Sequence, residues 1–196
     1  MKIVAITGGI GSGKSTLSKY LKRKYPVYES DKAVSDLYKK PSKSFFNLII
    51  SCGLELAIKK NQIDKNLIKD VFFNNPTIKR KIQKHIHREL KTSRAIFIKK
   101  NKHLMKKIIF LDIPLLFENN LEKSFDYVVS IISSKKKRID RVIKSKKFKK
   151  QTLNKILKSQ VTDKERRARS DIIIINNKTK KDFIFLAKQS LTTIIK

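Results

Sequence analysis

The sequence has 196 residues, 40% of them hydrophobic, and a formal net charge of +32, so it is long enough for one folded domain and is strongly basic. It has no run of about 18 apolar residues, and its N-terminal apolar run is broken at Gly8, which argues against a membrane-spanning helix and a signal peptide. A single cysteine, Cys52, excludes an internal disulfide and a multi-cysteine metal site, and together these features predict a soluble cytoplasmic protein.

The first predicted strand covers roughly residues 2–6 and leads into a glycine-rich turn. Four of the five glycines fall within six residues, and the stretch from Gly8 to Ser15 fits the phosphate-loop pattern of Gly, four residues, then Gly-Lys-Ser. Glycine lets the backbone turn through positive φ and bring its amides close to phosphate oxygens, in front of the following helix. Lys14 would add a charge toward the β- and γ-phosphates, and the Ser15 hydroxyl would ligate Mg²⁺. We predict a nucleotide site here; the alternative is a glycine-rich turn without a ligand.

The remaining elements alternate between helix and strand. We expect a helix from Lys14 that continues until Pro26 stops it, and a short strand at residues 27 and 28. Helical patterns follow at about 31–39, 44–51, 64–73 and 76–100, and strand-like runs at 107–112, 127–132 and 172–175. A basic helical pair is expected at about 135–169, and a terminal helix closes the chain.

The strand-like runs are rich in β-branched residues over nearly their whole length, which is typical of a parallel sheet buried on both faces. With a phosphate loop after the first strand, the alternation predicts an α/β fold with a doubly wound, five-stranded parallel sheet. We expect one domain over 1–196. Its core would comprise about 1–30, 104–134 and 170–196, with a helical insertion at about 31–103 and a helical lid at about 135–169.

The basic charge has two interpretations. A strongly basic protein is often a nucleic-acid partner, and an RNA-binding ATPase is one alternative here. The excess, however, is mostly lysine spread along the whole chain beside many isoleucines and asparagines, whose codons are all rich in A and T. Genome composition explains this pattern without selection for binding. We therefore expect no specific nucleic-acid partner and no membrane partner.

Several segments, taken in order, resemble the dephospho-CoA kinase family over nearly the whole length of the chain. The resemblance begins with Thr7 to Thr16, and its most diagnostic part is Asp112-Ile113-Pro114-Leu115-Leu116-Phe117-Glu118 after a core strand. Further matches are Asp31, Phe72 to Pro76, His87, Gln160, Arg166 to Asp171, and Asn176. The resemblance implies that ATP phosphorylates the 3′-hydroxyl of dephospho-CoA with the help of Mg²⁺. The alternative within enzymes is another phosphate-loop kinase, of the nucleoside monophosphate or shikimate type.

The resemblance also implies a role for individual residues. Lys14, Asp31 and Arg141 are the expected catalytic residues, and Asp31 would orient or deprotonate the acceptor hydroxyl. The alternative for Asp31 is an N-cap of the helix that begins there. The expected ATP contacts are Gly9, Gly11, Ser12, Gly13, Lys14, Ser15, Thr16, Arg138 and Asn176, with Ser15 as the metal ligand. The expected acceptor contacts are Asp31, His87, Pro114, Leu115, Leu116 and Glu118.

Ser145 and Asp112 lie close in sequence to these expected site residues. Ser145 stands where the family commonly has a second lid arginine, and Lys144 or Lys146 would have to substitute without the bidentate guanidinium fork. Asp112 has two open interpretations, as a holder of an Mg²⁺-bound water or as an ordinary loop carboxylate. The departure at Ser145 puts the rate in doubt more than the type of reaction.

Overall fold

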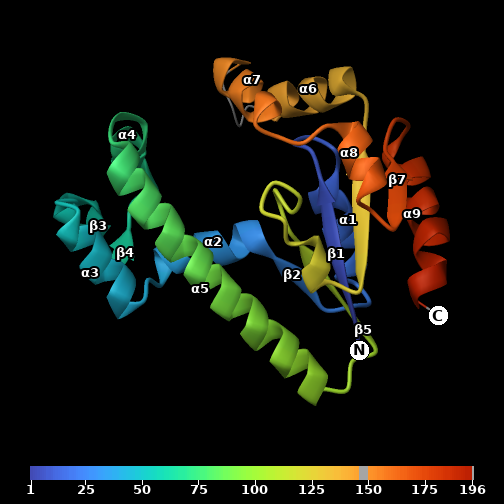
Figure 1. The fold of residues 1–196 in the computed structure, drawn as a ribbon, viewed down its shortest axis with the longest axis horizontal. Coiled ribbons are helices and arrows are strands. Elements are labelled where there is room, and N and C mark those ends of the chain that lie inside the picture. The colour runs from blue at the N-terminus through green and yellow to red at the C-terminus, as the bar shows by residue number, and fades with distance from the viewer. Residues whose placement is uncertain (146–149, 196) are drawn as a thin grey trace. The chain divides into compact units, whose positions relative to one another are not determined.

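A computed structural model describes residues 1–145 and 150–195, and the chain forms two compact units (Figure 1). The first, which we call the sheet unit, comprises Met1–Glu29 and Lys100–Lys196. The second, which we call the helical unit, comprises Ser30–Lys99. Each unit has a hydrophobic cluster of its own. Of the helices in the described residues, none has both the length and the apolar character needed to cross a bilayer.

The sheet unit is built on five parallel strands in the order β2-β5-β1-β6-β7. From the central strand β1 the chain forms the two strands on one side and then crosses to form the two on the other. The reversal lies beside β1, where parallel α/β sheets bind ligands at the carboxyl ends of their strands. The bounds are β1 Lys2–Gly8, β2 Val27–Glu29, β5 Ile108–Asp112, β6 Tyr127–Ile132 and β7 Ile172–Ile175.

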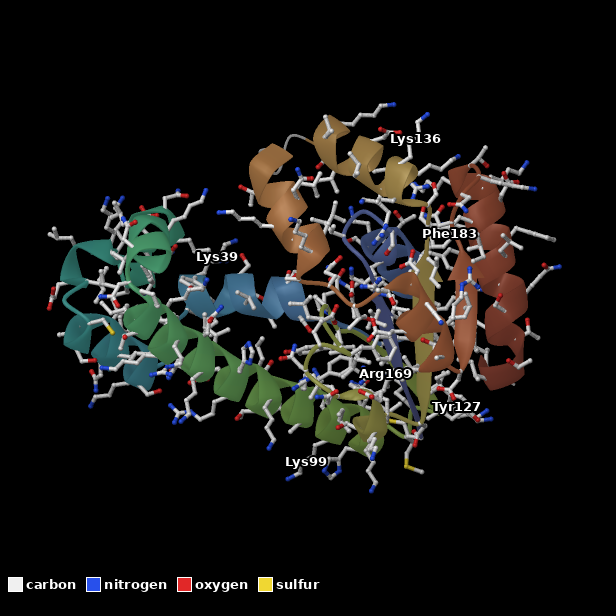
Figure 2. The ribbon with its side chains drawn as sticks, turned by 45° about the horizontal axis from the view of Figure 1, so that its top comes forward. Lys39, Lys99, Tyr127, Lys136, Arg169 and Phe183 are labelled. Atoms are coloured by element: carbon white, nitrogen blue, oxygen red, sulfur yellow. The ribbon has the colours of Figure 1, made fainter. Side chains whose placement is uncertain are left out.

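Helices cover both faces of this sheet, which confirms the predicted doubly wound α/β class. On one face α1 (Lys14–Leu21) and α9 (Lys180–Ile195) pack against the strands, and Phe183, labelled in Figure 2, lies in that core. On the other face α8 (Asp163–Ala168) contacts β6, and Ser170 donates to the Ser130 hydroxyl at 2.7 Å. Ser130 alternates with the core residue Val129 and so points to the opposite face.

Two sequence expectations need correction in the sheet unit. Helix α1 ends at Leu21, several residues before Pro26, because tight turns follow it and the Tyr25 ring then packs edge-on against Phe110 at 5.5 Å. The expected basic helical pair is three helices, α6 (Lys135–Lys144), α7 (Lys150–Lys158) and α8. A capping box between Thr162 and Glu165 starts the third helix and separates it from the second.

The helical unit packs α2, α3, α4 and α5 around a small core of its own. The helices are α2 Ser30–Lys39, α3 Lys43–Ser51, α4 Lys65–Asn74 and α5 Pro76–His103, close to the four predicted helices. The end of α5, from Lys100 on, belongs to the sheet unit. The hairpin of β3 (Ile58–Lys59) and β4 (Gln62–Ile63) was not predicted. Lys60 and Asn61 turn it with φ values of 48° and 58°, as a two-residue hairpin turn requires. The fully buried core side chains include Phe45, Ile49 and Ile82.

His85 lies in this core, and we expect it to make the stability of the protein depend on pH. Its ring stacks on Phe45 with centroids 4.9 Å apart, and Arg88 and Glu89 contact its two nitrogens. Burial lowers the pKa of His85 from 6.5; Glu89 raises it and Arg88 lowers it. The unfolded chain therefore takes up a proton at a higher pH than the folded chain does. The free energy of unfolding should fall as the pH drops below about 6.5.

Replacing His85 with phenylalanine keeps a ring against Phe45 but removes the titrating group. We expect this variant to lose less stability than the parent between about pH 7.5 and 5.5, measured by urea unfolding. The exposed His87 on the same helix gives the matched control, His87→Phe, which should keep the pH dependence of the parent. If His85→Phe and the parent lose the same free energy, His85 is not the source of the effect.

Candidate active site

The phosphate-loop segment connects β1 to α1 in the sheet unit. Gly13 immediately precedes α1 with a φ of 113°, a left-handed conformation that L side chains rarely adopt, and it caps the helix without a side-chain hydrogen bond. The first turn of α1 therefore directs its amides and the positive end of its dipole into the loop. Lys14 Nζ donates to the Gly8 carbonyl at 2.8 Å across the loop, and Ser15 is exposed beside it. The loop has the form of an anion site.

Arginine side chains from α6 lie directly against this loop. A Cβ atom added at Gly9 would lie 2.0 Å from Arg138 Nη1, so a side chain at this position would displace the guanidinium group from where it lies. Arg141 Nη1 donates to the Gly11 carbonyl at 3.2 Å and to Ser133 Oγ at 3.1 Å. Two of the predicted ATP-site cations are thus within contact of the predicted loop, although more than 100 residues separate them in the chain.

Asn176, just after β7, joins the same constellation. Its Nδ2 donates to the Ser12 carbonyl at 2.7 Å, and its own carbonyl accepts a hydrogen bond from Arg141 Nη2 at 2.9 Å. From the segment before α8, Gln160 Oε1 accepts the Ile10 amide at 3.0 Å. The loop is therefore held by α6, by the residue after β7 and by Gln160, so its shape depends on all three.

Arg138 is a buried cation with incomplete neutralisation. Its side chain is 11% exposed, Nη2 lies 3.8 Å from Asp163 Oδ2, and Nε is buried without a hydrogen-bond partner among the described atoms. Desolvation lowers the pKa of Arg138, the Asp163 carboxylate raises it, and Arg166 lowers it. A guanidinium remains charged under these conditions. An anionic oxygen from a ligand would therefore be stabilised beside it.

Replacing Arg141 with lysine keeps the charge but removes the fork that links Gly11, Ser133 and Asn176. We expect kcat to fall about 10- to 100-fold, because one ammonium cannot make these diverging hydrogen bonds at once. Steady-state kinetics with ATP measures the effect. Arg167→Lys, at an exposed arginine of α8, is the matched control and should leave kcat unchanged. Equal kcat values for the parent and Arg141→Lys would rule out the linking role of the fork.

Asp112 ends β5 at the same edge of the sheet. It is opposite Ile6 of β1 and Glu29 of β2 in the strand register, and its Oδ2 accepts a hydrogen bond from Ser18 Oγ at 3.0 Å. Ser18 lies three residues after Ser15, on the same side of α1. The carboxylate is therefore tied to the helix that carries the predicted metal ligand, a contact that no sequence motif indicates.

The predicted acceptor segment after β5 divides into exposed and anchoring residues. Leu115 is exposed, with a positive φ of 53°, and Pro114 is half-buried. Leu116 is fully buried, so it supports the segment from below. Glu118 Oε1 accepts the Val161 amide at 2.9 Å and lies 3.5 Å from Arg166 Nη2. Glu118 thus fastens the residues between α7 and α8, a role that the sequence did not indicate.

Two predicted site residues belong to the helical unit. Strand β2 ends at Glu29 and α2 begins at Ser30, so Asp31 lies exposed in the first turn of α2. The alternative of an N-cap is wrong, because strand and helix are contiguous and no cap residue separates them. His87 is exposed on α5. The catalytic role of Asp31 and the acceptor contact of His87 remain predictions.

Ser145, the departure from the lid pattern, is the C-cap of α6. Its hydroxyl donates to the Val142 carbonyl at 2.7 Å, so it closes the last turn of the helix. Lys144 is exposed in that turn, whereas Lys146 lies outside the described residues. That Lys144 or Lys146 takes the place of the missing arginine stays a prediction.

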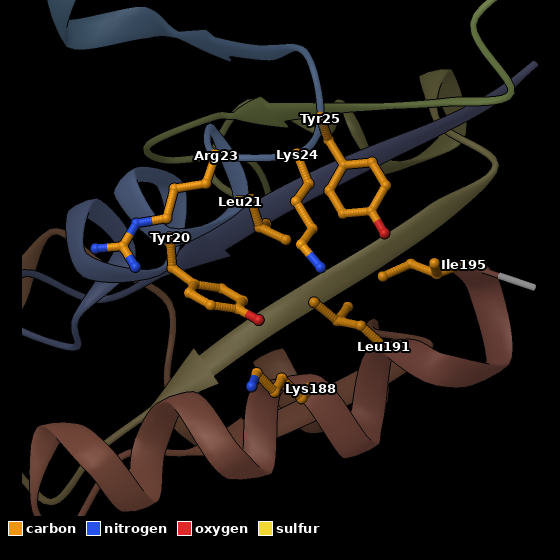
Figure 3. A pocket seen from close by; sticks show the side chains of 8 residues that line it. All are labelled: Tyr20, Leu21, Arg23, Lys24, Tyr25, Lys188, Leu191 and Ile195. Atoms are coloured by element: carbon orange, nitrogen blue, oxygen red, sulfur yellow. The ribbon is translucent and has the colours of Figure 1, made fainter.

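A hollow of about 480 Å³ lies between the end of α1 and α9, and Figure 3 shows the side chains around it. Tyr20, Lys24 and Tyr25 line it on one side, and Lys188 and Leu191 on the other. It lies at the opposite end of α1 from the phosphate loop and is separate from the candidate site. A second hollow, of about 490 Å³, is lined by residues that include Arg138, Gln160 and Asp163 and so adjoins the loop contacts.

Comparisons with known proteins identify the family of this chain. The dephospho-CoA kinase family model matches residues 2–182. The dephospho-CoA kinase of Fusobacterium nucleatum is 34% identical over 194 residues, covering 98% of each chain, and that of Streptococcus mutans is 31% identical over 183 residues, covering 91% of this chain and 90% of the relative. The solved structure of the dephospho-CoA kinase from Campylobacter jejuni has the same fold, with a TM-score of 0.75 at 21% identity over 98% of this chain and 96% of that one. The chain therefore belongs to the dephospho-CoA kinase family.

Proposed function

We propose that this protein transfers the γ-phosphoryl group of ATP to the 3′-hydroxyl of dephospho-CoA, giving coenzyme A and ADP. The convergence of Arg138, Arg141 and Asn176 on the phosphate loop is the observation that carries the proposal. These groups come from separate elements and meet at the positions that the family resemblance indicates for ATP. Positioning and charge stabilisation, which they supply, account for most of the catalysis of phosphoryl transfer.

On the donor side, the loop amides and Lys14 would take the β- and γ-phosphates. Among the described residues no group of three or more His, Cys, Asp or Glu side chains forms a metal site. We propose that Mg²⁺ is held mainly by phosphate oxygens and water, with Ser15 as the direct protein ligand. Bound Mg²⁺ would neutralise phosphate charge, and Asp112 is suited to hold one of its waters.

In the lid, the two arginines would act on the transferring group. Among the described residues, Arg138 has one buried nitrogen without a hydrogen-bond partner, and its paired carboxylate, Asp163, lies 3.8 Å away, so it can bond a phosphate oxygen without first breaking a close ion pair. Arg141 holds the loop in shape through its fork. We infer that residues 135–169 act as the lid that brings these cations to the nucleotide.

On the acceptor side, we infer that Asp31 orients the ribose hydroxyl and accepts its proton as the bond to phosphorus forms. Residues 31–103 would form the acceptor-binding insertion and contribute His87. Pro114 and Leu115 would form the lip of the acceptor site, and the buried Leu116 and anchored Glu118 would hold that lip in place. The core over 1–30, 104–134 and 170–196 would carry the nucleotide.

An acceptor panel tests the proposed function. Purified protein is given ATP and Mg²⁺ with dephospho-CoA, shikimate, or a nucleoside monophosphate, and ADP release is measured for each. We expect dephospho-CoA to stimulate ATP consumption far above the other acceptors. Equal or greater stimulation by shikimate or a nucleoside monophosphate would assign the chain to a different small-molecule kinase.

A further inference from the structure

The helical unit contains a hollow whose lining residues have no role in the mechanism proposed above. Its volume is about 400 Å³, and all of its lining belongs to this unit. Helix α2 contributes Val34 and Tyr38, and the other residues come from α4 and α5. The remaining lining residues are Lys65, Asn66, Ile68, Lys69 and Lys79.

Three lysines give this hollow a concentrated positive charge. Among the described side chains, none of Lys65, Lys69 and Lys79 forms an ion pair with a carboxylate. Lys65 Nζ lies 4.6 Å from the centre of the Tyr38 ring. Desolvation lowers the pKa of Lys65, and Lys39 lowers it further, while Asp31 and Asp36 raise it. The hollow thus offers ammonium groups to a bound anion.

Apart from the lysines and Asn66, the lining consists of Val34, Tyr38 and Ile68 and is largely apolar. Ile68 is buried at 2% exposure, and Tyr38 at 8% exposure packs edge-on against Phe45 at 5.4 Å. Burial raises the pKa of Tyr38 to about 12, so its hydroxyl remains a neutral hydrogen-bond donor. Val34 is half-buried beside them. A ligand that fits this lining is anionic at one part and aliphatic at another.

Helix α2 connects this hollow to Asp31. Asp31, Val34 and Tyr38 are spaced by three and four residues, which places them on one face of the helix. Seven residues of helix span about 10 Å, so Val34 lies within one turn of Asp31 along α2, and Tyr38 lies about 10 Å from it. Lys65 also experiences the charge of Asp31, which agrees with this placement.

We propose that this hollow binds the diphosphate and the pantetheine arm of dephospho-CoA while Asp31 holds the ribose 3′-hydroxyl. The inference rests on the proposed function. It concerns the diphosphate and the pantetheine arm, which distinguish dephospho-CoA from a plain nucleoside. The diphosphate hangs from the 5′-carbon of the same ribose, which suits Lys65, Lys69 and Lys79. The aliphatic part of the arm suits Val34, Tyr38 and Ile68.

The test compares a complete acceptor with one that lacks the arm. Adenosine carries the same 3′-hydroxyl but neither the diphosphate nor the pantetheine. For the parent, Lys65→Ala and Lys79→Ala, kcat/KM is measured with dephospho-CoA and with adenosine at saturating ATP. We expect each substitution to lower the ratio of the two values about tenfold, through a higher KM for dephospho-CoA, with the KM for ATP unchanged.

Two further variants separate a binding role from a general effect. Lys84→Ala, at an exposed lysine of α5 outside the hollow, should leave the ratio at the parent value. Lys65→Arg should keep most of the parent ratio of kcat/KM values, because arginine keeps the positive charge. Binding of 4′-phosphopantetheine, which carries the arm and one phosphate, should weaken by a similar factor in Lys65→Ala.

The outcomes distinguish the inference from the function on which it rests. Lys65→Ala and Lys79→Ala could lower kcat/KM by the same factor for both acceptors, or lower it for neither. Either result would show that the hollow does not bind the arm, while the assignment as a kinase would stand. Equal kcat/KM values of the parent for adenosine and for dephospho-CoA would also show that the hollow does not bind the arm. A parent that phosphorylates neither acceptor overturns the proposed function and the inference together.

Discussion

Replacing Lys14 with alanine is expected to abolish phosphoryl transfer and to leave the fold intact. The ammonium group spans the phosphate loop and donates to Gly8, so it is placed to neutralise charge on the transferring phosphoryl group. Loss of one such donor in a water-excluded site costs on the order of 10³ in kcat. Turnover is measured with dephospho-CoA under saturating ATP, and circular dichroism checks the fold.

The control for this substitution is Lys19→Ala. Lys19 lies exposed in the last turn of the same helix, away from the loop, and its removal should change kcat by less than about twofold. If Lys14→Ala retains most of the parent activity, the phosphate loop is not part of the mechanism. If both variants lose activity together with helical signal, the effect is on α1 itself.

Asp31→Asn is expected to lower turnover while ATP binding stays within about twofold of the parent. The amide keeps the size of the side chain but cannot accept the proton of the acceptor hydroxyl, so kcat should fall about 10²- to 10⁴-fold. ATP affinity is measured by calorimetry and kcat by ADP release. Because α2 begins at Ser30, the substitution does not remove a helix cap.

Asp36→Asn is the matched control, because Asp36 is an exposed carboxylate on the same helix. It should leave both kcat and ATP affinity near the parent values. Equal losses of turnover and ATP affinity in Asp31→Asn would demote Asp31 to a structural residue of the first turn. A loss in kcat alone supports its role at the acceptor hydroxyl.

The phosphate loop and the sheet were predictable from sequence because their signals are local. Glycines at Gly11 and Gly13 before a lysine specify a turn and a helix start within a few residues, and β-branched runs specify buried parallel strands. The contact of Arg138 with Gly9 was not predictable in this way. It joins residues far apart in the chain, and only the family resemblance indicated that both serve one site.

Other features had weaker or no sequence signals. The Thr162 and Glu165 pair is a capping-box pattern that could have shown the start of α8. The β3–β4 hairpin turns at Lys60 and Asn61, without the glycine that usually marks such a turn. The sequence around Glu118 does not indicate that its carboxylate accepts a hydrogen bond from the Val161 amide, because that contact depends on how two loops meet in the fold.

The fate of the γ-phosphoryl group tests the central claim most directly. The protein is incubated with Mg²⁺, dephospho-CoA and ATP labelled at the γ-phosphate, and the product is separated and its labelled position is identified. Transfer to the ribose 3′-hydroxyl of dephospho-CoA, giving labelled coenzyme A, is the result that we predict. Label recovered only as inorganic phosphate, or on another hydroxyl, would contradict the assignment of this chain as a kinase acting on that group.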